Sequence, residues 1–176
     1  MKNSFCFALI TGLLAALPGL ALGQPNPFHD AGAKIRGDVY WPSKAASRSI
    51  EHARNYAQDF QTYATKIEKP EPSVVADVKT KMGHYLEEAK THLATMKKDF
   101  AKDKETVAAI EKIEKDLATA TDANTAMIEC CENETFDKIA GMACCKDFVK
   151  SLDKVHAAHQ ALMKKLSAKP ATKDGK

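Results

Sequence analysis

The residues best suited to chemistry are two pairs of adjacent cysteines, Cys130-Cys131 and Cys144-Cys145, with twelve residues between the pairs. If those twelve residues form the turn between two helices, the pairs face each other across a helical hairpin. Successive residues on a helix point about 100° apart, so each pair offers one inward thiol and one flanking thiol. Cys131 and Cys145 are the inward ones, because they fall in the apolar stripes of their helices.

This end of the hairpin allows two interpretations. Two disulfides would staple it, since an exported protein meets an oxidising compartment and four cysteines remain once Cys6 is removed with a signal peptide; each bridge would contribute roughly 2–4 kcal/mol. Alternatively, the thiolates form a site for a soft metal such as Cu(I), with the thioethers of Met127 and Met142 beside them. Zinc fits less well, because its usual C-x-x-C ligand spacing is missing.

Histidines form a second group with a possible chemical role. His159 lies in the middle of the last predicted apolar stripe, and His156 precedes it by one turn. Folding the chain at its predicted turns brings residues of the other helices within a turn or two of the same level, at ~1.5 Å per residue. Histidines that converge from several helices with a carboxylate are typical of a metal site in a bundle core. The predicted metal ligands are His159, His156, His92, His52 and Glu114.

The alternative is that these residues, which we call the histidine layer, have a structural role and bind no metal. His159 would then be a core imidazole that is hydrogen-bonded to Glu114 or Asn124, with the other histidines at the surface. Asp153 is placed three residues before His156, where it is expected to orient the His156 imidazole. His84 is expected to point outward.

Most catalytic chemistries lack their motifs. The sequence has no Glu-x-x-His, C-x-x-C-H, glycine-rich phosphate loop, G-x-S-x-G or H-E-x-x-H. The cysteine and histidine layers are also about half a helix length apart, which disfavours a Cys–His nucleophilic pair. Nothing specific supports a non-covalent haem between His159 and His52 or Met163. We therefore predict no enzyme, and copper or zinc as the expected cofactor.

The charge pattern argues against a nucleic acid as the binding partner. The chain has 26 Lys and Arg against 23 Asp and Glu, interspersed along the helices in the manner of solvated surfaces. A nucleic-acid-binding protein would show a basic stripe, and none is visible in the sequence. The expected partner is a metal ion; the sequence indicates no particular protein partner.

Residues 1–23 have the three parts of a secretory signal: a positive start at Lys2, an apolar run, and small residues before Gln24. Pro18 and Gly19 interrupt the apolar run short of the ~20 residues that span a bilayer, which disfavours a membrane anchor. We expect cleavage before Gln24, no membrane span in the mature chain, and export to the periplasm or the medium.

The rest of the chain predicts one all-α domain. Residues 24–42 are predicted to form an irregular arm that lays Tyr40 and Trp41 over one end of the bundle. Residues 43–167 are predicted to form the bundle itself, and residues 168–176 a disordered basic tail. Pro70 and Pro72 end the first helix, and Ser73 and Asp103 are expected to cap the next two. Short connections between amphipathic helices predict an antiparallel up-down-up-down four-helix bundle. The expected core stripes, at alternating spacings of three and four, are Ile50, Ala53, Ala57, Phe60, Ala64 and Ile67; Val75, Val78, Met82, Leu86, Ala89, Leu93, Met96 and Phe100; Ile110, Ile113, Leu117, Ala120, Asn124, Met127 and Cys131; and Cys145, Phe148, Leu152, Val155, His159, Leu162 and Leu166.

Overall fold

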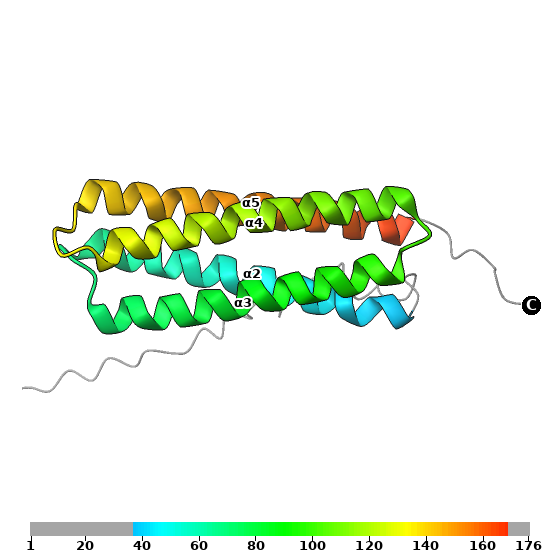
Figure 1. The fold of residues 1–176 in the computed structure, drawn as a ribbon, viewed down its shortest axis with the longest axis horizontal. Coiled ribbons are helices and arrows are strands. Elements are labelled where there is room, and N and C mark those ends of the chain that lie inside the picture. The colour runs from blue at the N-terminus through cyan, green and yellow to red at the C-terminus, as the bar shows by residue number, and fades with distance from the viewer. Residues whose placement is uncertain (1–36, 169–176) are drawn as a thin grey trace, which may run out of the picture.

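A computed structural model describes residues 37–168 of the chain as four long α-helices. They are α2 (Gly37–Lys66), α3 (Pro72–Asp99), α4 (Lys104–Glu132) and α5 (Lys138–Ala168), lying side by side in Figure 1. Each helix packs against the next along the chain, and α5 closes the ring against α2. The all-α class is confirmed, and this packing is consistent with an up-down bundle. None of the described helices combines the length and the apolar character that a membrane crossing needs.

The predicted core is confirmed almost residue by residue. The expected inward positions are buried, except Ile67 and Phe100, which are only half-buried at helix ends. Stripes with spacings of three and four put one continuous face of each helix against its neighbours. Asn124 and His159 are buried among the apolar residues of these stripes.

The first helix begins earlier than predicted. α2 starts at Gly37 and includes Pro42, so residues 37–42 are not part of an irregular arm. Pro42 lies in the second turn of α2, so its missing N–H removes one backbone hydrogen bond near the helix start. The Trp41 side chain is 63% exposed and does not cover the bundle end as predicted. The predicted signal peptide, residues 24–36 of the predicted arm, and the predicted tail after Ala168 lie outside the described residues.

The helix starts show which capping predictions were correct. Asp103 caps α4: its carboxylate accepts hydrogen bonds from the Thr106 N–H at 3.1 Å and the Thr106 hydroxyl at 2.9 Å. The prediction for Ser73 was wrong, because α3 begins at Pro72 after an N-cap at Glu71. Proline is suited to the first helical position, where its missing N–H would have had no partner.

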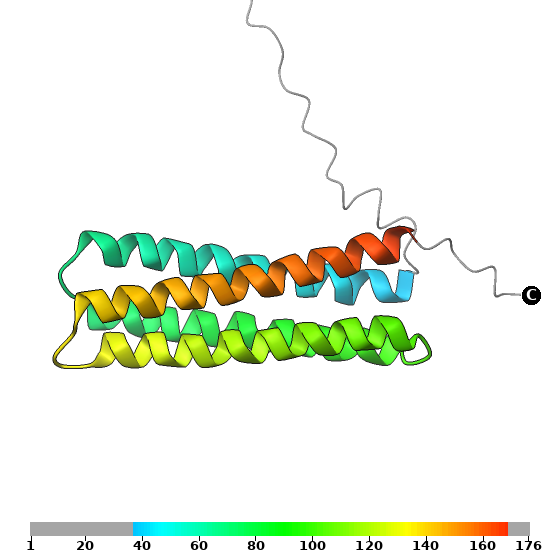
Figure 2. The same ribbon diagram turned by 90° about the horizontal axis from the view of Figure 1, so that it is seen from above.

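The two ends of the bundle carry different connections (Figures 1 and 2). The α2–α3 and α4–α5 connections lie at one end, which we call the sulfur end because it holds Cys130, Cys131, Cys144 and Cys145. The α3–α4 connection lies at the other end, with the start of α2 and the end of α5.

Candidate functional site

The two cysteine pairs face each other across the α4–α5 hairpin, as predicted. The Cys130 and Cys144 sulfur atoms, which form the outer pair, are 2.7 Å apart and half-buried. Cys131 and Cys145 form the inner pair, which is buried, and their thiols are close enough to shift each other's pKa. All four are free thiols in this structure, and the 2.7 Å contact is longer than the S–S bond of about 2.0 Å.

The turn that aligns these pairs is shorter than predicted. Only residues 133–137 separate α4 from α5, which begins at Lys138 rather than near Cys144. Asp137 accounts for the early start, because its carboxylate accepts hydrogen bonds from the N–H groups of Ile139 at 2.8 Å and Ala140 at 3.3 Å. Side-chain acceptors of this kind satisfy the free donors of a first helical turn. The added turns carry Cys144 and Cys145 along α5 to the level of Cys130 and Cys131.

Gly141 contributes to the same turn through the absence of a side chain. Gly141 is buried, and a Cβ atom there would lie 2.5 Å from the Phe136 ring. The ring can therefore fold back from the connection onto the first turn of α5. This pair was not predicted, because Gly141, four residues before Cys145, was assigned to the turn rather than to the helix.

The two thiols on α5 are less acidic than an ordinary cysteine. Burial, with the hydrogen bond to Cys130, raises the pKa of Cys144 to about 11. The hydrogen bond to Cys131 and burial raise the pKa of Cys145, while the same bond lowers the pKa of Cys131. Cys144 and Cys145 are therefore protonated near neutral pH, and ligation or oxidation must remove their protons.

Thioethers lie next to the thiols. Met127 is fully buried one turn before Cys131 on α4, and the half-buried Met142 precedes Cys145 by three residues on α5. Residues three or four apart are neighbours on a helix surface. The sulfur end therefore brings the six predicted sulfur-bearing side chains into one region.

His159 is the most unusual residue of the predicted histidine layer. It is 0% exposed, and neither ring nitrogen has a hydrogen-bond partner among the described residues. The expected alternative, a hydrogen bond to Glu114 or Asn124, is not formed. Burial, with a smaller effect of nearby His156, lowers the pKa of His159 to about 4. His159 is therefore a neutral imidazole at physiological pH.

His156 has different neighbours from those predicted. Its Nε2 lies 3.7 Å from the Glu51 carboxylate on α2 and 3.1 Å from the Gln160 amide. Asp153 does not orient His156, because it pairs with Arg54 at 2.5 Å. Both Arg54 and Glu51 come from the neighbouring helix, so spacing along α5 alone did not reveal them.

The other predicted ligands are dispersed. His52 is exposed, with its ring 5.4 Å from the Tyr85 ring, and His92 is half-buried. Glu114 accepts a 2.7 Å hydrogen bond from Lys97. His84 is exposed as expected, 3.3 Å from Glu88. Within residues 37–168, no three His, Cys, Asp or Glu side chains form a group that could hold a metal ion. The five-residue ligand set stays a prediction.

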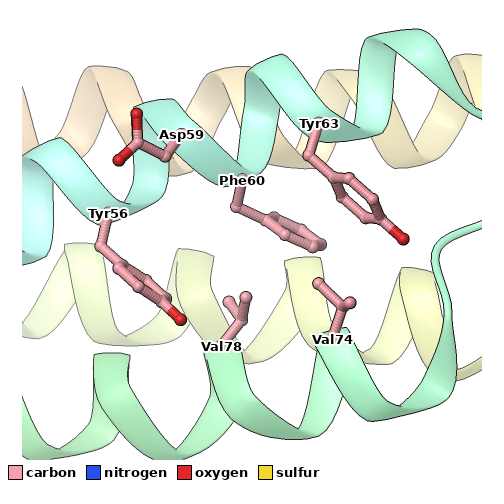
Figure 3. Close-up of a pocket in the computed structure, with 6 residues that line it drawn as sticks. All are labelled: Tyr56, Asp59, Phe60, Tyr63, Val74 and Val78. Carbon is pink, nitrogen blue, oxygen red and sulfur yellow. The ribbon is translucent and has the colours of Figure 1, made fainter.

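A shallow hollow of about 190 Å³ lies between α2 and α3 (Figure 3). The side chains of Tyr56, Phe60 and Tyr63 lean from α2 toward Val74 and Val78 on α3.

The hydroxyl groups at this hollow already have partners. Tyr56 donates a hydrogen bond to Asp77, which raises the pKa of Tyr56 to about 12, and Tyr63 accepts one from the Glu71 N–H at 3.1 Å. Tyrosines at such boundaries commonly place a ring on the core and a hydroxyl in water. The hollow therefore offers apolar contact rather than reactive groups.

Comparisons of the chain with protein-family models, with curated proteins and with solved structures find no match.

Proposed function

We propose that this protein is an exported metal-binding bundle that takes up Cu(I) at its sulfur end and serves as a copper buffer, carrier or sensor. The observation that carries the proposal is the pairing of four cysteine side chains across the α4–α5 hairpin, Cys130 with Cys144 and Cys131 with Cys145. Thiolates and thioethers are the ligands that Cu(I) prefers.

The arrangement in pairs favours copper over zinc. Cu(I) accepts low coordination numbers, including two thiolates, so that one cysteine pair is a sufficient site. A structural zinc ion needs four ligands in a tetrahedron. Each copper ion would replace the two thiol protons of its pair, which makes the affinity fall as the pH falls.

A second candidate is a disulfide-stapled helical module with no ligand, which acts in structure or in protein interaction. The 2.7 Å contact between the Cys130 and Cys144 sulfur atoms favours this alternative for the outer pair. Oxidation would remove two protons and two electrons from a pair, to an oxidant of the export compartment, and would leave no thiolate for copper.

The deciding experiment is a Cu(I) titration of reduced protein under anaerobic conditions against a competing chelator. We expect saturation at two copper ions per chain. The double variant Cys130→Ser/Cys144→Ser should bind one, and His159→Ala should bind as the parent does. A parent without saturable binding would overturn the proposal.

A thiol titration of unfolded, unreduced protein isolated anaerobically completes the test. Four reactive thiols agree with the copper site. The absence of free thiols, together with the failure of Cu(I) to bind, would establish the stapled module instead. If His159→Ala alone abolished binding, the copper would belong to the histidine layer.

A further inference from the structure

The end of the bundle opposite the sulfur end is strongly basic. The terminal segments that meet there are residues 37–48, 97–105 and 164–168, and together they hold eight Lys or Arg against four Asp or Glu. Along the sequence these charges are far apart, and only the fold gathers them. We call this region the basic end.

The basic end also presents an exposed aromatic side chain. Trp41 is 63% exposed, its ring centroid lies 6.0 Å from that of Tyr40, and the Arg48 guanidinium is 5.9 Å from the centre of the Trp41 ring. Trp41 is the only tryptophan of the chain. An amphipathic ring beside cationic groups is a combination that is enriched where proteins meet the headgroups of a membrane.

The chain outside the described residues adds charge of the same sign. Residues 24–36 and 169–176 adjoin the two helix termini at this end, and they contain five Lys or Arg against two Asp or Glu. The sulfur end differs: residues 129–138, which comprise the end of α4, the α4–α5 connection and the start of α5, hold four acidic residues and one lysine. The two ends of the bundle therefore differ in the sign of their net charge.

We propose that the basic end docks on an anionic membrane surface, with Trp41 entering the headgroup region and the bundle remaining outside the bilayer. Charge complementarity identifies the occupant, because anionic lipids attract clustered Lys and Arg at about 1 kcal/mol per residue. Docking in this way would direct the sulfur end away from the membrane. The proposal does not depend on copper.

Trp41 fluorescence supplies the test, because no other tryptophan contributes. The sample is mature protein from the export compartment of an expression host, without added metal. It is titrated with vesicles of phosphatidylcholine alone or of phosphatidylcholine and phosphatidylglycerol in equal parts. We expect a blue shift with the anionic vesicles only, and its loss in high salt. Equal binding to neutral vesicles, or no binding to either, would overturn the proposal.

Matched variants locate the surface. Arg48→Gln should weaken binding to the anionic vesicles about fivefold. Lys81→Gln, in the half of α3 that is nearer the sulfur end, should change binding less than twofold. In a sedimentation assay, Trp41→Ser should lose about tenfold, while Ile139→Ser, at the 84% exposed apolar residue near the sulfur end, should bind as the parent does. Equal losses at both ends would contradict a specific docking surface. A Trp41 shift with duplex DNA but not with vesicles would assign the basic end to nucleic acid instead.

Discussion

At the scale of single residues, His159 makes the stability of the bundle depend on pH. Its pKa is about 4 in the folded protein and about 6.5 in an unfolded chain. Above pH 6.5 the imidazole is neutral in both states. Between pH 6.5 and 4 the unfolded chain binds a proton that the folded protein does not, so the free energy of unfolding falls as the pH falls. The loss approaches roughly 3 kcal/mol at pH 4.

His159→Leu should remove this dependence. It should also stabilise the protein at pH 7.5, by about 1–3 kcal/mol, because two buried nitrogen atoms without partners are replaced by an apolar group. Denaturant unfolding at pH 7.5 and 4.5 measures both effects, with His84→Ala as the exposed control. If the free energy of unfolding depends on pH equally in the parent and in His159→Leu, His159 is not the source of this pH dependence.

At the scale of helices, replacing Gly141 or Gly83 with alanine should change the stability of the bundle in opposite directions. A Cβ at Gly141 would meet the Phe136 ring at 2.5 Å, whereas a Cβ at Gly83 would have nothing within 4 Å. Gly141→Ala must displace the ring that covers the start of α5, and we expect a loss of about 1–3 kcal/mol. Gly83→Ala, in the interior of α3, should gain about 0.5–1 kcal/mol.

Thermal and denaturant unfolding of both variants checks this pair. Because α5 carries Cys144 and Cys145, Gly141→Ala should also slow disulfide formation or weaken Cu(I) binding, while Gly83→Ala should affect neither. If Gly141→Ala is as stable as the parent, the Phe136 ring does not constrain the turn.

Helix packing was predictable from the sequence because burial follows the period of the helix. Ile110 and Leu152 were assigned to the core by spacing alone, and both are 0% exposed. Helix ends were less predictable, since they depend on local contacts: Asp137 starts α5 early, and Pro72 displaces Ser73 from the cap of α3. Contacts between helices were the least predictable, as Glu51 beside His156 illustrates, because they require the rotation of both helices to be known.

At the scale of the whole molecule, both candidate functions of the sulfur end depend on the compartment in which the protein works. In an oxidising compartment, the outer pair would tend toward a disulfide. In a reduced protein, the raised pKa values of Cys144 and Cys145 keep their thiols protonated until a metal displaces the protons.

The prediction at this scale is export with removal of residues 1–23. Signal peptidases require small residues near the cleavage point, and Ala21 and Gly23 precede Gln24 at the −3 and −1 positions. Protein recovered from the export compartment should begin at Gln24, as read by N-terminal sequencing and by intact mass. Ala21→Arg should block cleavage and leave a longer, membrane-retained chain, whereas Asn26→Arg, just beyond the cleavage point, should be processed normally. Recovery of a mature chain that keeps Met1 would contradict export, and Cys6 would then have to be counted among the thiols.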